Sequence, residues 1–374
     1  MKEHALPPSL GSPDSPDSPD SPDSIAELPD GFDEALPAPF ADLWYIVARS
    51  RDLGPKPLAR RLYGRDLVLF RDGAGRAAAL EDRCLHRHVR LSRGRVDGGA
   101  LECPYHGWRF DGGGACVGVP CAAPCETLPR RRVPSFAVVE QEGSVWACVG
   151  PNPPPAPPRW RRPEEEAAGA AWFEAELVMA TPLRWVLENF VDCGHTGFVH
   201  GGLFRGKPTR VVRAVVEDTP TGVRVETFGE SDPQSLLGRL FASRGEIMQH
   251  TDEIVLPHQA RIRYRFGARS ALTVSICTPE DAGTTRMFTR VYVDFGPLSR
   301  LVAALVYPVT RRIMLQDQVI LEDQAAQVRR YGARFGGSSA ADVPAAFVAR
   351  AFDELGRGTF PRTPGRKKEI EYKL

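Results

Sequence analysis

Residues 84–108 read CLHRHVRLSRGRVDGGALECPYHGW and gather two cysteines and three histidines into one short stretch. The spacing is Cys84-x-His86, then sixteen residues, then Cys103-x2-His106. Each half is a short clip, and the loop between them closes at modest entropic cost. Two thiolates and two imidazoles suit a tetrahedral zinc ion. They equally suit a [2Fe-2S] cluster in which the cysteines bind one iron and the histidines the other. The ligand types alone leave both metals open.

The composition is that of an ordinary globular protein. The chain has 374 residues, enough for two domains with separate cores. Its 48 Lys and Arg balance 47 Asp and Glu, so no nucleic-acid partner is implied, and eight cysteines are too few for a disulfide scaffold. No secretory leader is evident, and the apolar run at 301–309 is about half of a membrane span. We therefore expect a cytoplasmic protein without a membrane partner, in which paired cysteines more often bind metal than form disulfides.

Low-complexity and proline-rich segments suggest where the domains begin and end. Residues 1–35 contain the repeat SPDSPDSPDSPD, which can bury nothing and predicts a disordered tail. PNPPPAPP at 151–158 predicts a stiff linker. Between them, residues 36–150 contain pairs of short strands separated by glycine-containing turns, which predicts a small antiparallel β domain. Each metal-binding clip follows one of these strands, so we expect the clips to be neighbouring loops.

Residues 159–355 mix strands and helices. AWFEAELVMA at 171–180 predicts a strand, and five alternating runs between 209 and 295 predict an antiparallel sheet. Three segments have helical patterns and lie at 181–195, 298–331 and 342–355. In the first of them Thr181 is the expected N-cap and Pro182 lies in the first turn. The polar and basic residues 356–374 predict a surface tail.

The helix predicted over 181–195 ends in a second group of potential ligands. Asp192 and His195 share a helix face. His200 follows five residues after His195, about 140° away in ideal α geometry. Both imidazoles can reach one metal only if the helix loosens or ends between them, and a π-bulge is one way to do so. Two histidines with a carboxylate form the facial triad of Fe(II) oxygen chemistry, whereas two unrelated surface histidines are the alternative.

Taken together, the two groups resemble the Rieske non-haem iron oxygenases, at the level of a single-subunit terminal oxygenase component. The first stretch matches the family's C-x-H and C-x2-H motif, including Arg87 and the ending CPYHGW. The second, from Asn189, matches its N-x2-D-x2-H-x4-H motif. The resemblance covers roughly residues 40–330. It implies an α+β fold: an N-terminal antiparallel β Rieske domain, then a catalytic domain whose antiparallel sheet is covered by helices in a helix-grip, START-like arrangement.

The resemblance also implies the ligands of two metal centres. The [2Fe-2S] cluster would be held by Cys84, His86, Cys103 and His106. His195 and His200 would bind a mononuclear Fe²⁺, with an acid on the long helix near the C-terminus as third ligand. LQDQVILEDQ offers Asp317, Glu322 and Asp323. The family's spacing selects Asp317, and Asp323 is the runner-up.

Asp192 and Asn189 are the candidate catalytic residues that are not metal ligands. In the family, the carboxylate at the position of Asp192 links an iron-binding histidine to a cluster histidine of the neighbouring subunit. Such a link fixes the imidazole tautomer and gives electrons a short path. It also implies a head-to-tail homotrimer.

The implied function is an oxygenase that uses O₂ and electrons from a separate reductase or ferredoxin. It would hydroxylate, demethylate or oxidatively remodel a small apolar or aromatic molecule. Two other functions remain as alternatives: an electron carrier similar to Rieske ferredoxins, and a zinc-stabilised binding module.

Four ligand-type residues that lie within or shortly after the first stretch are not part of its motif. His88 creates a C-x-H-x-H pattern, but the cluster is already supplied with ligands, so we do not expect it to bind iron. Cys116, Cys121 and Cys125 are expected to be buried or loop thiols.

Overall fold

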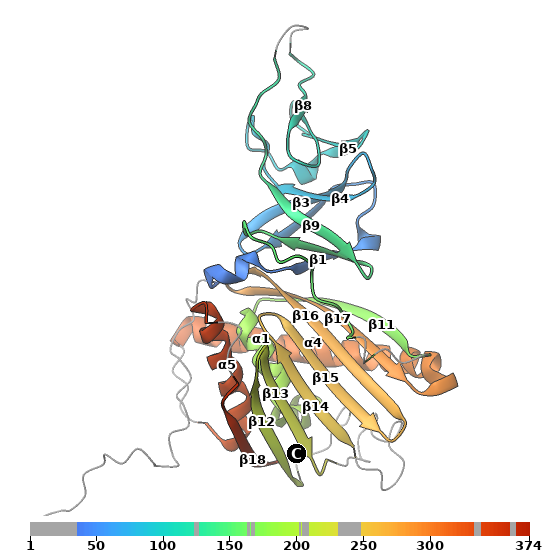
Figure 1. Ribbon diagram of the computed structural model, residues 1–374, viewed down its shortest axis with the longest axis vertical. Coiled ribbons are helices and arrows are strands. Elements are labelled where there is room, and N and C mark those ends of the chain that lie inside the picture. Colours follow the sequence, from blue (N-terminus) through green and yellow to red (C-terminus); the bar gives the residue numbers. More distant parts are fainter. Residues whose placement is uncertain are drawn as a thin grey trace, which may run out of the picture.

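The computed structural model describes residues 36–122, 127–162, 165, 169–201, 203, 209–230, 248–332, 338–359 and 364–374. The tail predicted over residues 1–35 and the thiol of Cys125 lie outside these residues. The described chain forms two parts stacked along the long axis of the molecule (Figure 1). A β-rich part lies at the top, and a larger sheet with helices lies below it.

The upper part contains two antiparallel sheets. The first has six strands in the order β1-β10-β9-β4-β3-β2, and the second has four in the order β5-β6-β7-β8. The strands of the first are β1 Tyr45–Arg49, β2 Leu58–Leu62, β3 Arg65–Arg71, β4 Ala77–Glu81, β9 Ser135–Gln141 and β10 Ser144–Cys148. Those of the second are β5 Arg95–Asp97, β6 Ala100–Glu102, β7 Arg109–Phe110 and β8 Cys116–Gly118. The hairpins β3–β4, β7–β8 and β9–β10 confirm the predicted pairs of strands.

The lower part is one antiparallel sheet of eight strands in the order β11-β17-β16-β15-β14-β13-β12-β18. Its strands are β11 Ala171–Met179, β12 Val211–Thr219, β13 Gly222–Phe228, β14 Gln249–Val255, β15 Gln259–Phe266, β16 Arg269–Asp281, β17 Thr284–Asp294 and β18 Lys367–Lys373. The helices are α1 Leu183–Val191, α2 Thr196–Val199, α4 Ser299–Tyr331 and α5 Val343–Gly356. Short 3-10 helices are η1 Ala38–Asp42, η2 Ser50–Asp52, η3 Leu91–Arg93, η5 Cys193–His195, η6 Gly296–Leu298 and η7 Ala340–Asp342.

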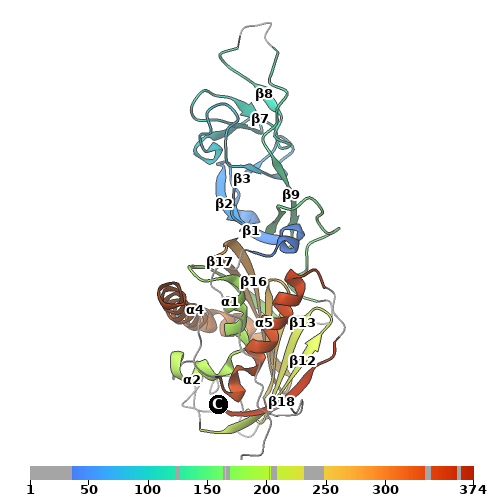
Figure 2. The same cartoon turned by 90° about the vertical axis from the view of Figure 1, so that its left-hand side faces the viewer.

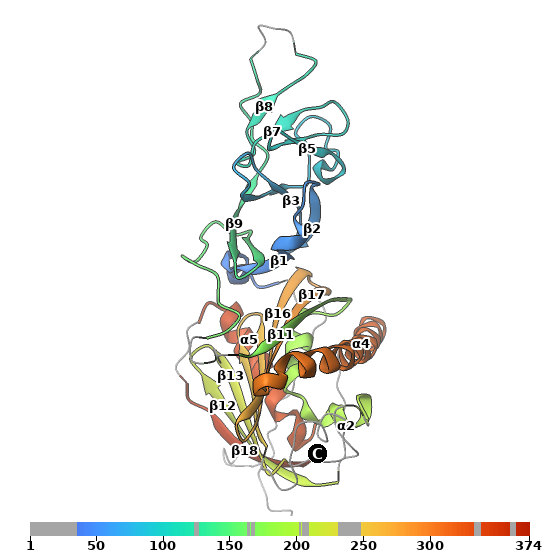
Figure 3. The same cartoon turned by 90° about the vertical axis from the view of Figure 1, so that its right-hand side faces the viewer.

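The helices of the lower part gather on one side of its sheet. Figures 2 and 3 show α2 and α4 on the same side, with α5 beside β12 and β13. α4 packs on β11 and β17, and α5 packs on α1, β12 and β13. The packing of α1 and α5 against the sheet forms the largest apolar core, in which Leu187, Val348 and Phe352 contact apolar side chains of the strands. This arrangement confirms the predicted order of a β domain followed by a sheet covered by helices. Among the described residues, no helix is long and apolar enough to cross a membrane.

Two strands differ from the sequence-based expectations. Residues 356–374 were expected to form a polar tail, but Lys367–Lys373 pair along β12 as the edge strand β18. Charged residues are common on edge strands because they oppose further pairing, and here Ile370 alone is buried. β14 was also missed, because its sequence QHTDEIV places His250 and Asp252 at inward positions where an apolar residue is normal.

A shared apolar core joins the two parts. Trp44, Ile46 and Trp146 of the upper part pack against Leu272, Val274, Ile276 and other residues of β16 and β17. The hydroxyl of Thr278 donates to the carbonyl of Ile46 at 2.7 Å. The upper part therefore packs against β16 and β17 of the large sheet.

Candidate metal centres

The two clips of the upper part have the same backbone geometry. The amide of Cys84 donates to Val89 and that of His88 back to Cys84, at 2.9 and 3.0 Å. In the other clip the amide of Cys103 donates to Trp108 and that of Gly107 back to Cys103, at 2.8 and 3.1 Å. Each clip thus closes as one tight loop, with His88 (φ 58°) and Gly107 (φ 71°) as the left-handed residues.

The side chains of the clips form a compact group at the end of the upper part. Cys84 and Cys103 are buried, and burial together with the neighbouring Cys103 thiol raises the pKa of Cys84 to about 11. The imidazoles of His86 and His106 lie on the more open side with ring centroids 4.5 Å apart, and His86 stacks on Trp108. The buried Nδ1 of His86 makes no hydrogen bond to any described residue. Two inner thiols and two outer imidazoles fit a [2Fe-2S] cluster bound through two cysteines and two histidines.

The second group of ligands lies where the first helix of the lower part breaks. α1 ends at Val191, not at 195 as predicted, and begins after Pro182 with no side-chain cap from Thr181. Asp192 leaves the helix with ψ 84°. The chain then forms the single turn η5 and the short helix α2, after which His200 is the C-cap. The expected loosening is present, but as a break followed by two short turns rather than a π-bulge.

This break brings both histidines to the carboxylate of Asp317 on α4. The Nε2 atoms of His195 and His200 lie 3.4 and 3.0 Å from the Oδ1 atom of Asp317. One donor atom from each of the three residues lies within 4.8 Å of the others. Asp317 Oδ1 is buried without a well-formed hydrogen bond among the described residues. Three converging donors of this kind fit a two-histidine, one-carboxylate iron site with open positions.

Electrostatics couple the three ligands. Burial alone would lower the pKa of His195, but the carboxylates of Asp192 and Asp317 raise it, to about 9. Burial alone would raise the pKa of Asp317, but the two imidazoles hold it below its usual value. The site is therefore arranged for positive charge beside the carboxylate, which a divalent cation would supply.

The helix face of α4 explains why Asp317 and not Asp323 reaches the site. Met314 and Leu321 are buried in the large core, and Asp317 lies three residues after the first and four before the second, on the same face. Asp323 is exposed, and its carboxylate accepts only from Gln327 at 3.4 Å among the contacts given for it. Glu322 accepts instead from the backbone amide of Ala180 at 2.9 Å.

Gln316 is a site residue that the sequence analysis missed. Its Oε1 lies 3.1 Å from His200 Nδ1, which fixes the tautomer that leaves Nε2 facing Asp317. A glutamine beside an expected ligand gives no signal in sequence.

Asp192 sits between the iron-type site and the surface. One carboxylate oxygen lies 3.7 Å from His195 Nδ1, and the other accepts from the amide of Gly194 at 3.0 Å. Its side chain is 40% exposed, in contrast to His200, at 2%. Asn189 is half-buried on α1, one turn before Asp192.

Models of two protein families match successive parts of the chain. The Rieske [2Fe-2S] domain matches residues 43–137, and the vanillate O-demethylase oxygenase C-terminal domain matches residues 179–355. The first contains all four clip ligands, and the second contains the three converging residues of the lower part. The chain belongs to the Rieske oxygenases.

Curated relatives of this Rieske oxygenase match over part of their length. The 4β-methylsterol monooxygenase of Methylococcus capsulatus is 37% identical over 158 residues, 41% of this chain and 42% of the relative. Aminopyrrolnitrin oxygenase PrnD of Pseudomonas fluorescens is 33% identical over 187 residues, 47% of this chain and 50% of the relative. The chain thus spans about half, or less, of the length of these relatives.

Solved structures share the fold of this Rieske oxygenase along most of the chain. Dicamba monooxygenase bound to dicamba superposes with a TM-score of 0.68 at 23% identity, over 85% of this chain and 98% of that one. NdmA of Pseudomonas putida with caffeine gives a TM-score of 0.68 at 20% identity, over 86% and 93%.

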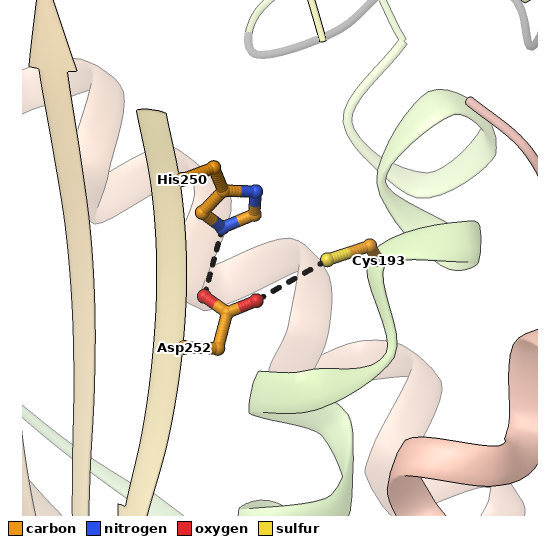
Figure 4. A group of neighbouring side chains, drawn as sticks. All are labelled: Cys193, His250 and Asp252. Atoms are coloured by element: carbon orange, nitrogen blue, oxygen red, sulfur yellow. Dashed lines mark hydrogen bonds and ion pairs between the residues drawn. The ribbon is translucent and has the colours of Figure 1, made fainter. Parts of the chain in front are cut away.

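A third group of ligand-type residues in this Rieske oxygenase was not expected from the sequence. Cys193, His250 and Asp252 lie together, all buried (Figure 4). Asp252 receives hydrogen bonds on both oxygens: Oδ1 lies 2.8 Å from His250 Nε2, and Oδ2 lies 3.4 Å from Cys193 Sγ. Glu230 lies 2.9 Å from the other nitrogen of His250. The sequence places His250 and Asp252 two residues apart, so on a strand they share one face. This segment was not predicted to be a strand.

Three other ligand-type residues that the sequence analysis considered lie apart from these groups. His88 is exposed on its clip. Cys116 is buried in β8, where its thiol lies 3.7 Å from the carbonyl of Gly118, and Cys121 is exposed.

Proposed function

We propose that this chain is the terminal oxygenase component of a Rieske-type monooxygenase system. The observation that carries the proposal is the convergence of His195, His200 and Asp317 on one point, in a chain that also has a Rieske domain. An electron carrier needs no such second site.

The residues have separate tasks in this proposal. Bound [2Fe-2S] would relay electrons, and a bound mononuclear Fe²⁺ would activate O₂. Cys84, Cys103, His86 and His106 hold the first group, and His195, His200 and Asp317 hold the second. Gln316 accepts the Nδ1 proton of His200, so the Nε2 lone pair stays directed at the metal.

We propose that electrons cross between subunits through Asp192. Within one chain, the clips adjoin β5 and β7 at the tip of the upper part, whereas α2 lies low in the other part (Figures 2 and 3). Asp192 is partly exposed and contacts the His195 side of the iron site, so a cluster histidine of a second copy can reach it. α4 exposes apolar side chains that suit a subunit contact: Leu301, Leu305, Leu315, Val319 and Ile320. A head-to-tail homotrimer would place each cluster beside a neighbour's iron.

The substrate in this proposal is a small apolar or aromatic molecule. Dicamba, theobromine and caffeine are bound in the structures with the same fold, and aminopyrrolnitrin names the oxygenase of one relative. The relative from Rhizorhabdus wittichii, a chloroacetanilide N-alkylformylase, is named an oxygenase component. We therefore expect a separate reductase or ferredoxin to deliver electrons.

The test is a turnover assay with a surrogate reductase, NADH and a panel of aromatic methyl ethers, N-methyl amines and apolar polycyclic molecules. Mass spectrometry should detect a product that has gained one oxygen or lost one methyl group, with O₂ consumed. A chain with iron and sulfide in the cluster alone, and no O₂ uptake stimulated by any molecule tested, would favour the electron carrier. Zinc in the clips without sulfide would favour the binding module.

A further inference from the structure

Cys193, His250 and Asp252 form a buried group of ligand-type residues that is separate from the iron-type site. β14 turns one face inward, and that face presents His250, Asp252 and then Ile254. Across the sheet Asp252 lies between Val225 and Ile262, and His250 lies between Thr227 and Tyr264, so much of the surroundings is apolar or aromatic. Ionisable side chains are rarely placed there unless they are paired or bind a metal. Cys193 completes the group from η5, on the opposite side of the interior from β14.

The chemistry of the donors differs from that of the iron-type site. A thiol, an imidazole and a carboxylate are a mixed sulfur, nitrogen and oxygen set, which suits Zn²⁺. His195, His200 and Asp317 offer only nitrogen and oxygen. We propose that Cys193, His250 and Asp252 form a second metal site, for a buried divalent cation of the Zn²⁺ type, separate from the mononuclear iron.

The distances agree with this proposal. One donor atom from each residue lies within 4.8 Å of the other two. In a tetrahedral zinc site, bonds of about 2.0 Å to nitrogen or oxygen and about 2.3 Å to sulfur separate the donors by roughly 3.3 to 3.5 Å. His250 Nε2 and Asp252 Oδ1 are 2.8 Å apart, and Asp252 Oδ2 and Cys193 Sγ are 3.4 Å apart. Because the two contacts use different oxygens of Asp252, its carboxylate would turn as the ion binds, and its contact with His250 would open by about half an ångström.

Glu230 supplies the supporting contact that zinc histidines usually have. It is buried, and its Oε2 lies 2.9 Å from His250 Nδ1. A carboxylate that accepts the Nδ1 proton leaves Nε2 as the metal-binding nitrogen and increases its basicity. Tyr264 stacks on the imidazole at a centroid distance of 4.3 Å and holds the ring plane.

The charges balance when the ion binds. Without metal, burial opposes protonation of His250, but Asp252 and Glu230 raise its pKa to about 9. Binding of Zn²⁺ displaces one proton from His250 Nε2 and one from Cys193 Sγ. Two positive charges leave and two arrive, so the net charge of the buried group is unchanged.

A bound ion would cross-link two elements that shape the iron-type site. Cys193 lies two residues before His195, and His250 and Asp252 both belong to β14, the fifth of the eight strands in the order of the sheet. The link would hold the break after α1 against β14 and so fix the position of His195. Because all three ligands are buried, the ion must enter while the chain folds or through a local opening.

The test uses the full-length protein expressed in zinc-supplemented medium, with its iron restored and loosely bound zinc removed by desalting. We expect about one zinc per chain, with an X-ray absorption spectrum that contains one Zn–S bond of about 2.3 Å beside shorter Zn–N and Zn–O bonds. A single sulfur ligand distinguishes the proposed site, because zinc in the iron-type site would show nitrogen and oxygen only and zinc in the clips would show two sulfurs, from Cys84 and Cys103. His200→Ala should therefore leave the Zn–S bond in place.

Matched variants assign the ligands. Cys193→Ser should abolish the Zn–S bond, whereas Cys277→Ser, which alters another buried thiol, should not. Asp252→Asn should lower zinc occupancy, and Glu230→Gln should weaken zinc binding about 10- to 100-fold while keeping the sulfur. Retained cluster absorption and far-UV circular dichroism establish that each variant folds. The proposal is overturned if wild-type protein holds no zinc with a sulfur ligand, or if the Zn–S bond survives in Cys193→Ser. The group would then be a hydrogen-bonded cluster only.

Discussion

The two candidate metal centres differ in how far apart in sequence their ligands lie. All four ligands proposed for the cluster come from the stretch 84–108, on two loops with the same backbone hydrogen bonds. The ligands proposed for the mononuclear iron extend from His195 to Asp317 and meet only because α4 packs beside the break after α1, on the same side of the sheet. The first centre depends on local turns, and the second depends on the tertiary position of one helix.

This difference determines how each centre should respond to substitution. Loss of a clip ligand removes a cofactor whose binding energy is part of the folding energy of a small domain. Loss of an iron ligand leaves the surrounding core in place, because Met314 and Leu321 still anchor α4. A substitution of a ligand in the first centre should therefore reduce both the visible absorption and the stability of the protein. A substitution of a ligand in the second centre should reduce product formation alone.

The largest effect is expected for Cys84→Ser. The variant should lose the visible absorption of the cluster and all product formation, and its upper part should unfold at lower temperature than that of the wild type. Absorption spectroscopy, acid-labile sulfide analysis and calorimetry measure the three effects. Cys148→Ser is the control, since Cys148 is a buried thiol of the same part that contacts the backbone carbonyl of Ala41 at 3.4 Å. A normal cluster spectrum in Cys84→Ser would refute the ligand assignment.

Asp317→Asn should abolish product formation without changing the visible spectrum. The amide removes the negative charge that faces both imidazoles, so the protein should lose one iron of three and keep its sulfide. Asp323→Asn, on the exposed side of the same helix, should remain active. Iron analysis and the turnover assay decide. If Asp323→Asn were the inactive variant, the third ligand would lie six residues further along α4.

A smaller effect is expected for Asp192→Asn, which tests the connection between the two centres. Both metals should remain bound, because Asp192 touches His195 only on the Nδ1 side. We expect reoxidation of a pre-reduced cluster, in the presence of substrate and O₂, to slow by about 10- to 100-fold, as for other carboxylates that support metal-bound histidines. Stopped-flow absorption measures this rate. An unchanged rate would remove Asp192 from the electron path.

A mixed oligomer tests the same connection from the other side. Cys84→Ser lacks the cluster and His195→Ala lacks the mononuclear iron, so each is inactive alone. Co-expressed, they should recover part of the activity, because some interfaces then pair an intact cluster with an intact iron. A verified mixed oligomer without activity would show that electrons do not cross between subunits.

The same contrast explains what the sequence could and could not predict. Both clips follow from spacing alone, because turns and metal ligands are local. Asp317 was selected by the family's spacing, and its helix face between Met314 and Leu321 agrees with that choice. The end of α1 was placed four residues too late, since the sequence 192–195 has no proline and Asp192 breaks the helix through its own backbone angles.

The elements missed were those in which charged residues occupy unusual positions. β14 hides His250 and Asp252 inside the sheet, and β18 presents charged residues at its edge. Neither shows the apolar alternation by which strands are recognised. Gln316 was missed for another reason, since its role depends on the tautomer of His200, which only the folded chain defines.

The smallest effect is expected for His88→Gly, which separates the backbone of a clip from its ligands. His88 occupies in the first clip the left-handed position that Gly107 occupies in the second. A residue with a Cβ costs about 1–2 kcal/mol in that conformation, and glycine loses roughly 0.5–1 kcal/mol through the unfolded chain. His88→Gly should therefore raise the free energy of unfolding by up to about 1.5 kcal/mol and leave the cluster spectrum unchanged. Gly107→Ala should do the opposite, because its Cβ would also lie 3.0 Å from Pro120. Urea unfolding midpoints, read by circular dichroism and by loss of cluster absorption, measure both variants. Loss of the cluster absorption in His88→Gly would indicate that His88 is a cluster ligand. The two clips would then not be equivalent.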